Sequence, residues 1–308
     1  MIRRLVHVGN VVIDLVTTVP ALPARGSDVL AAAMVATAGG GFNVLAAAAR
    51  QGLPAVYAGP VGTGPFADIA AAALRVEGVE VLQPARPEDT GLVLTIVDGG
   101  GERTFVTSPE STVGATAAEL ATIDPVPGDA VSVSGYEFLH GPSREALLPW
   151  LAALPAGVTV VFDPGPLAPW STPDAVTTVL ARADWCTANA AEAAEITGRP
   201  DPVSAAVALG GRIGSIVRTG ADGCVVALRH REPVPVAGFA VAVVDTTGAG
   251  DAHTGVFVAA LAAGADPVAA ARTANAAGAL TVTRHGPATC PTAAELAAFL
   301  SSAPAGRS

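Results

Sequence analysis

Short runs of apolar, β-branched residues alternate along the chain with longer alanine-rich stretches. This alternation is typical of the α/β class, in which helices flank a central, mostly parallel sheet. The predicted strands cover residues 5–9, 55–59, 79–82, 130–134, 158–163, 184–187, 213–217 and 223–228. The predicted helices cover residues 42–51, 65–77, 143–153, 172–182, 189–197, 248–263 and 266–284, followed by a terminal helix from Pro291 to Leu300 with Thr292 as its N-cap.

Residues 11–37 and 90–107 interrupt this rhythm, because they contain extended runs without an intervening helical stretch. Asp98-Gly99-Gly100-Gly101 separates two of these runs and predicts a hairpin turn. We expect both regions to pair as a small β lid outside the main sheet, where it covers the active edge or forms a homodimer interface. No linker or low-complexity tract divides the sequence, so residues 1–308 are expected to form one domain with this lid inserted.

Composition excludes several classes of function. All 17 basic residues are arginine, so neither a Walker A phosphate loop nor a lysine Schiff base is available. The net charge of −10 argues against a nucleic-acid partner, because such binding requires neutralisation of phosphates. The three cysteines lack the spacing of zinc ligands, and their odd number suits a reducing compartment. Glycines divide the longest uncharged stretch, which argues against a membrane span. We therefore expect a cytoplasmic protein.

The segment from Asp245 to Asp251 carries the strongest chemical signal. The apolar residues before it end at Asp245, and a helix is expected to begin near Gly248. Gly248, Ala249 and Gly250 leave backbone N–H groups open at the helix start, which makes an anion site. Asp251 in the first turn is placed to take a proton from an attacking hydroxyl, and the helix dipole favours its ionised form. The alternative is structural: a tight turn in which Asp251 only complements the helix N-terminus.

A known family carries the same motif. The ribokinase-like, or PfkB, family of sugar and nucleoside kinases has a D-T-x-G-A-G-D signature, which the chain resembles at Asp245-Thr246-Thr247-Gly248-Ala249-Gly250-Asp251. Three further stretches resemble family motifs: Ala38-Gly39-Gly40-Gly41-Phe42-Asn43, Gly9-Asn10-Val11-Val12-Ile13-Asp14 and Asn189-Ala190-Ala191-Glu192. These motifs run from residue 9 to residue 251, so the resemblance covers essentially the whole chain and implies a ribokinase-like fold.

The resemblance implies roles in phosphoryl transfer. Asp251 is expected to be the general base, and the amides of Gly248, Ala249 and Gly250 are expected to stabilise the transferring phosphoryl group. The residues that the resemblance assigns to the substrate are Asp14, Gly39, Gly40 and Asn43. Gly40 stands where ribokinases proper have lysine, which argues against ribose itself as the substrate.

Two further residues are expected at the substrate. Glu137 follows a predicted strand at the same edge of the sheet and is expected to contact the sugar. Arg103, in the lid hairpin, is expected to close over an anionic substrate. Structural alternatives remain open for several of these residues: a turn for Asp14, a helix cap for Asn43 and a solvated surface position for Arg103.

The nucleotide and its metal are expected on the other side of Asp251. The resemblance implies that Glu192 acts on Mg²⁺ through water, with Asn189 nearby, although the pair also reads as a simple helix start. The residues implied to border ATP are Thr219, Gly220 and Gly223 in one loop and Asn275 beside the adenine. The residues implied to hold a monovalent cation such as K⁺ are Asp245, Thr247 and Gly286.

Two rival classes are weaker. Gly62-Thr63-Gly64-Pro65-Phe66-Ala67 nominally fits a dinucleotide-binding fingerprint, but it lies in the second βα unit and lacks a suitable acidic partner. A non-enzymatic binding protein on the same fold is expected to lose the base or the anion site, and both are present.

The sequence therefore predicts ATP-dependent phosphorylation of a hydroxyl of a small carbohydrate, a sugar or a sugar acid. A nucleoside kinase of the same family is the alternative. A nucleoside base would need apolar or aromatic contacts, and the aromatic residues near the predicted site are Phe42, Phe105, Tyr136 and Phe138.

Overall fold

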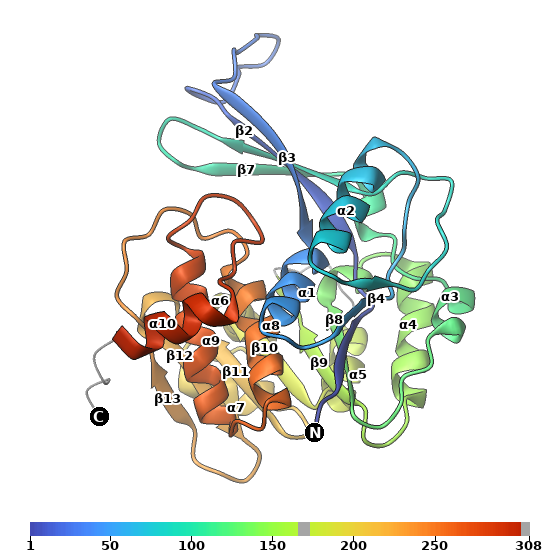
Figure 1. Cartoon of the computed structure of the whole chain (residues 1–308), viewed down its shortest axis with the longest axis vertical. Coiled ribbons are helices and arrows are strands. Elements are labelled where there is room, and N and C mark those ends of the chain that lie inside the picture. The colour runs from blue at the N-terminus through green and yellow to red at the C-terminus, as the bar shows by residue number, and fades with distance from the viewer. Residues whose placement is uncertain (166–172, 303–308) are drawn as a thin grey trace.

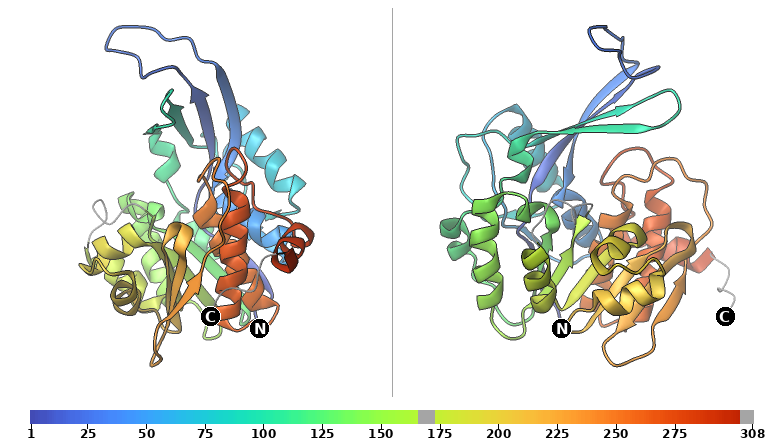
Figure 2. Two further views of the ribbon diagram at one scale, coloured as in Figure 1. Left: turned by 90° about the vertical axis from the view of Figure 1, so that its left-hand side faces the viewer. Right: turned by 180° about the vertical axis from the view of Figure 1, so that it is seen from behind.

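A large sheet lies between two layers of helices, and a second, smaller sheet projects from one end of it (Figures 1 and 2). This is the arrangement in a computed structural model that describes residues 1–165 and 173–302. In spatial order, the large sheet consists of β13 (Val234–Ala237), β12 (Gly223–Leu228), β11 (Gly214–Arg218), β10 (Trp185–Asn189), β9 (Thr159–Asp163), β8 (Asp129–Ser134), β1 (Arg4–His7), β4 (Ala55–Tyr57) and β5 (Glu80–Val81). In this sheet β12 runs opposite to the other eight strands, so the expected mostly parallel sheet is confirmed.

The helices cover both faces of the large sheet, as the two views of Figure 2 show. One layer holds α1 (Gly41–Arg50), α8 (Ala249–Ala262), α9 (Pro267–Thr281) and α10 (Ala293–Ser302). The other holds α3 (Ala117–Thr122), α4 (Gly141–Ala153), α5 (Pro173–Arg182), α6 (Ala190–Thr197) and α7 (Pro202–Leu209). Consecutive strand residues serve opposite layers: Leu5 packs with α1 and α8, and Val6 with α3 and α4. This double burial explains why the strands are continuous apolar runs.

The small sheet is built from the two regions that interrupt the βα rhythm. Its strands, in spatial order, are β3 (Ala33–Gly40), β2 (Val11–Thr18), β6 (Leu92–Val97) and β7 (Arg103–Thr107). Asp98 forms the predicted hairpin turn, because its side chain accepts hydrogen bonds from the N–H groups of Gly100 and Glu102. Helix α2 (Pro65–Val76) packs under the base of this sheet, where Leu74 shares an apolar cluster with Ile13 and Leu45.

Every predicted strand and helix is present, with ends shifted by a few residues. Thr292 caps α10 as expected, since its hydroxyl accepts the N–H of Glu295. The first residue of the predicted helix 172–182 lies outside the described residues. Helices α3 and α7 and strand β13 were not predicted, because each is too short to show a period of its own. No helix in the described ranges is both long and apolar enough for a bilayer crossing.

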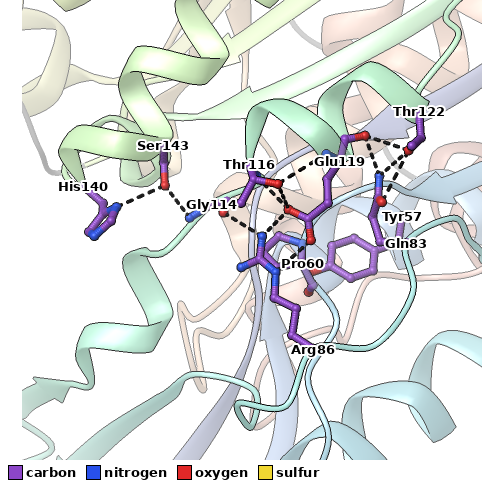
Figure 3. Close-up of polar contacts among 10 residues, drawn as sticks. All are labelled: Tyr57, Pro60, Gln83, Arg86, Gly114, Thr116, Glu119, Thr122, His140 and Ser143. Carbon is purple, nitrogen blue, oxygen red and sulfur yellow. Dashed lines mark hydrogen bonds and ion pairs between the residues drawn. The ribbon is translucent and has the colours of Figure 1, made fainter.

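A polar cluster fixes the chain where it leaves the small sheet (Figure 3). Arg86 pairs with Glu119, which also closes the capping box of α3 with Thr116. Arg86 Nη2 also donates to the carbonyl of Gly114 (3.2 Å), and the N–H of Gly114 donates to Ser143 Oγ (2.9 Å). The segment after β7 is thereby held from two sides. None of the ten residues drawn in Figure 3 lines the cavity described next.

Candidate active site

A cavity of about 1170 Å³ lies between the carboxyl ends of the central strands and the small sheet. In α/β proteins with open parallel sheets, ligands bind at this edge. The strands β1, β8, β9, β10 and β11 contribute His7, Ser134, Asp163, Asn189 and Arg218 to its wall. The small sheet contributes Val12, Asp14, Gly40, Val93, Phe105 and Thr107.

The start of helix α8 faces this cavity. Gly248 is the N-cap residue with φ of 74°, a left-handed conformation that glycine adopts without strain. Gly248, Ala249, Gly250 and Asp251 all line the cavity. First-turn amides of a helix lack intrahelical acceptors and attract anions. The N–H of Ala249 already donates to Thr246 O (3.3 Å). Of the three amides expected to bind an anion, those of Gly248 and Gly250 therefore contribute more than that of Ala249.

Asp251 lies in the first turn of α8 and is half-buried. Its Oδ2 accepts a hydrogen bond of 2.9 Å from Asn43 Nδ2, which reaches it from α1. Burial raises the pKa of the Asp251 carboxyl to about 7, while the hydrogen bond from Asn43 acts in the opposite direction. Desolvation of the carboxylate is the largest influence on this pKa, and it opposes the helix dipole, which favours the ionised form. A carboxyl with this pKa suits a general base at neutral pH.

Asp14, Gly39 and Gly40 meet where β2 pairs with β3. Asp14 lines the cavity, and burial raises its pKa to about 6. A Cβ atom on Gly39 would overlap the Asp14 carboxylate, so Gly39 itself does not line the cavity but makes room for that side chain. Gly40 has φ of 58° and does line the cavity. Gly39 is therefore needed for Asp14 to face the cavity, whereas a Cβ atom on Gly40 would lie 2.9 Å from the carbonyl oxygen of Asn10.

Glu137 is buried at the end of β8, with its side chain 2% exposed. Its two oxygens accept the N–H groups of Asn10 and Ser134, each at 3.0 Å. Burial raises the pKa of Glu137 to about 7 despite these bonds. His7 lies close by with a pKa lowered by burial to about 4, so its ring is neutral at pH 7. Together with Asp14, His7 and Glu137 form a polar part of the cavity wall.

Asn189 and Glu192 form the capping box of α6: Asn189 Oδ1 accepts the N–H of Glu192, and Glu192 Oε2 accepts the N–H of Asn189. The structural interpretation as a helix start is therefore confirmed. Both residues also line the cavity, and their roles toward Mg²⁺ and the nucleotide stay predictions. Burial raises the pKa of Glu192, and the nearby charge of Asp163 adds to this effect.

Sequence reasoning missed Asp163 and Arg218. Each is the last residue of its strand and lines the cavity. Arg218 Nη1 donates to Asp163 Oδ2 (3.0 Å), and Arg218 Nη2 lies 3.8 Å from Glu192 Oε2. The guanidinium also lies against Gly250, where a Cβ atom would be 3.4 Å from Arg218 Cζ. The signal that could have found them is polar residues at the ends of buried parallel strands.

Other predicted site residues divide into two groups. Gly220, Gly223 and Asn275 line the cavity, although the Asn275 side chain also binds the carbonyls of Val236 and Ala237. The predicted residues that do not line it are Thr219, Asn43, Gly39, Arg103, Asp245, Thr247 and Gly286.

Arg103 pairs with another part of the chain. Its Nη2 lies 2.5 Å from Asp245 Oδ1, so the guanidinium is bound to a protein carboxylate, and its expected contact with a substrate stays a prediction. The pairing forms because the β6–β7 hairpin brings a cation next to an acidic residue of the loop before α8.

The nominal dinucleotide fingerprint at Gly62–Ala67 begins helix α2 as such a motif would. The carboxylate of Asp89 accepts the N–H groups of Phe66 (3.3 Å) and Ala67 (2.8 Å) at this helix start. A protein carboxylate thus occupies the position that a pyrophosphate would take.

Comparisons with known proteins agree with this architecture. Residues 2–294 match the family described as pfkB family carbohydrate kinase. The chain is 33% identical over 301 residues to the uncharacterized sugar kinase YegV of Escherichia coli (strain K12), covering 94% of this chain and 91% of that protein. It is 32% identical over 308 residues to the ATP-dependent ribose-1-phosphate kinase of Halopiger xanaduensis, with coverage of 97% and 98%.

Solved structures have the same fold. The ribokinase of Thermotoga maritima superposes with a TM-score of 0.80 at 24% identity, covering 97% of this chain and 99% of that one. The fructokinase of Vibrio cholerae, solved with fructose, ADP and calcium, superposes with a TM-score of 0.78 at 26% identity and the same coverage. The chain therefore belongs to the pfkB family of carbohydrate kinases and has the ribokinase-like fold. It is a phosphotransferase that acts on an alcohol group.

Proposed function

We propose that this protein transfers the γ-phosphoryl group of ATP to a hydroxyl of a small carbohydrate, a sugar or a sugar acid. The observation that carries the proposal is the pairing of Asp251 with the α8 amides inside one cavity that has a polar and an apolar end. A carboxylate next to an anion site is what in-line transfer from a phosphate ester to a hydroxyl requires.

We place the carbohydrate acceptor at the polar end of the cavity. Asp14 and Gly40 come from the small sheet, and Asn10 and Glu137 lie beside them. Carboxylate oxygens with raised pKa values and backbone carbonyls suit the hydrogen bonds of sugar hydroxyls. Of the aromatic residues weighed for a nucleoside base, Phe42 and Phe138 are buried in apolar clusters, which leaves Phe105 and Tyr136 at the cavity. This favours a carbohydrate over a nucleoside.

We place ATP at the apolar end of the cavity. The residues that line it are Gly220, Gly223, Gly238, Phe239, Ala240, Val241, Asn275, Ala279 and Val282. A flat, mostly apolar surface with a few polar groups suits an adenine ring. The triphosphate then points toward Gly248 and Gly250, where the helix start stabilises negative charge.

The proposed reaction uses groups of this chain at each step. Asp251 takes the proton of the acceptor hydroxyl, and the oxygen attacks the γ-phosphorus as the bond to ADP breaks. The α8 amides and the Arg218 guanidinium stabilise the charge on the phosphoryl oxygens. Arg218 also compensates the carboxylates of Asp163 and Glu192, with which it is in contact or close proximity.

Mg²⁺ is expected to accompany ATP. No group of three or more potential metal-ligating side chains is present among residues 1–165 and 173–302. The pair of carboxylates Asp163 and Glu192 nevertheless fits Mg²⁺, which keeps several waters and binds through one or two carboxylates together with substrate phosphates. When bound there, the ion would neutralise charge on the phosphates.

Turnover with Mg·ATP, measured as ADP release, tests this function against a panel of sugars, sugar acids and nucleosides. We expect one or more sugars or sugar acids to be phosphorylated and nucleosides to be turned over at least about tenfold more slowly in kcat/KM. Preference for a nucleoside, or no turnover with the whole panel, contradicts the proposal.

A further inference from the structure

Arg103 joins the small sheet to the loop that leads into α8. It is the first residue of β7, and the β6–β7 hairpin extends over the loops of the C-terminal third of the chain (Figure 1). Besides its pairing with Asp245, Arg103 Nη1 donates to Thr246 Oγ1 (3.2 Å). The side chains of Arg103 and Asp245 are 27% and 16% exposed. Because the pair is largely shielded from water, it is stronger than an exposed ion pair.

Asp245 organises the backbone before the anion site. Its Oδ1 accepts the N–H of Thr247 (2.8 Å), and its Oδ2 accepts the N–H of Gly286 (3.0 Å). The carboxylate therefore ties the loop before α8 to the loop after α9. Gly248, whose left-handed conformation starts α8, follows immediately. A shift of this carboxylate would move the amides that are proposed to hold the phosphoryl group.

The residues at Asp245 do not fit the monovalent cation that the family resemblance implies there. The N–H groups of Thr247 and Gly286 point at the carboxylate, and the guanidinium of Arg103 already compensates its charge. A monovalent ion at this carboxylate would be repelled by the guanidinium and would lack the substrate phosphates that are expected to offset such repulsion for Mg²⁺ at Asp163 and Glu192.

We propose that Arg103 is a positioning residue that takes the place of a monovalent cation at Asp245 and thereby orders the anion site only when the small sheet lies over the cavity. The inference rests on the proposed function and deepens it. Asp14 and Arg103 belong to the same sheet, so an acceptor held at Asp14 stabilises the position in which Arg103 reaches Asp245. Acceptor binding and order at the anion site are then coupled.

Steady-state kinetics test the role of Arg103. The wild type is expected to work equally well with Na⁺ or K⁺ as the only added monovalent cation. Arg103→Ala is expected to lower kcat by about 100-fold, because the anion site is displaced. The acceptor KM is expected to rise by less than about tenfold, because acceptor binding is coupled to the position of Arg103. Added guanidinium ion, or the conservative Arg103→Lys, is expected to restore most of the lost rate. Arg25→Ala, an exposed arginine of the β2–β3 connection, serves as the control.

Two results would overturn the proposal: a wild type that requires K⁺, or an Arg103→Ala variant in which only the acceptor KM rises. The second would mean that Arg103 binds the substrate directly, as the sequence predicted.

Amide hydrogen exchange provides a readout that needs no turnover. In Arg103→Ala, the segment 245–250 is expected to exchange about tenfold faster than in the wild type and in Arg25→Ala. Unchanged exchange overturns the positioning role whatever the activity. If the acceptor panel fails while exchange accelerates, the proposed function is wrong and the link between Arg103 and the α8 loop stands.

Discussion

Asp251 experiences opposing influences on its charge. The helix start and the Asn43 amide favour the carboxylate, whereas burial favours the neutral acid, and burial dominates. The residue is therefore half ionised near pH 7, so it can both accept a proton from the acceptor and later release it.

The pH dependence of kcat/KM follows from this balance. Because the pKa of Asp251 is raised, the base is ionised above pH 7 and becomes protonated as the pH falls, so activity is lost toward acid pH. In Asn43→Ala the acid limb should move upward by about one pH unit, since a hydrogen bond to the charged form is removed. Glu137 also titrates near pH 7, but other donors hold it, namely the amides of Asn10 and Ser134. An acid limb that does not move in Asn43→Ala would assign it to a group other than Asp251.

At the level of single residues, sequence reasoning worked where a motif fixes the chain locally. The glycine motif placed Asp251 at the start of a helix because glycines and a following alanine-rich run define that start. Sequence reasoning could not show that Asn43 contacts Asp251, or that Arg218 contacts Asp163, because these pairs are 208 and 55 residues apart in the chain. Arg103 was placed in the correct hairpin, but its partner Asp245 depends on how that hairpin lies over a distant loop. The catalytic and binding roles themselves stay predictions.

Helices α1 and α8 pack closely and set the distance between Asn43 and Asp251. Gly255 of α8 forms part of this contact: a Cβ atom there would lie 2.5 Å from the carbonyl oxygen of Val44 and 2.6 Å from Ala47 Cβ. Backbone atoms are in the way, so α8 would have to move away from α1.

Gly255→Ala is expected to lower the free energy of unfolding by about 1–3 kcal/mol through overpacking, although alanine is the better helix former. Gly278→Ala in α9 is the matched control, since its Cβ would lie 3.6 Å from the carbonyl of Ala249, an ordinary contact. It is expected to raise the free energy of unfolding by about 0.5–1 kcal/mol. Urea denaturation measures both variants. Equal effects of the two substitutions would contradict the close packing of α1 on α8.

Helices and strands were predictable from the sequence where both their length and their composition indicated the same type of element. Helix α8 and strand β8 stood out because apolar runs end at glycine or at a polar residue. Helix α7 has only eight residues and is apolar on most sides, so it shows no helical period. Strand β13 contains Pro235 and lies at the edge of the sheet, a composition that argues against a strand.

At the scale of the whole molecule, the two sheets contribute different residues to the candidate site. The large sheet presents Asp163, Asn189 and Arg218 at the carboxyl ends of its strands. The small sheet brings Asp14 to the same cavity and Arg103 to the loop before α8. The alternation of strands and helices predicted the large sheet, and its interruption at residues 11–37 and 90–107 predicted the small one. The homodimer through the small sheet stays a prediction.

The central claim is that Asp251 acts as the general base of a kinase, and Asp251→Asn tests it most directly. The substitution keeps the size of the side chain and its place beside Asn43 while it removes the proton acceptor. We expect kcat with the best carbohydrate acceptor to fall by about 10²–10⁴-fold. Calorimetric affinities for Mg·ATP and for the acceptor should stay within about threefold of the wild type, because neither needs the base.

Glu195→Gln, which neutralises an exposed carboxylate on α6, controls for loss of charge alone and is expected to retain full activity. A kcat of Asp251→Asn within tenfold of the wild type, with binding intact, would contradict the account. A large loss of kcat with both affinities preserved is the result that the account predicts.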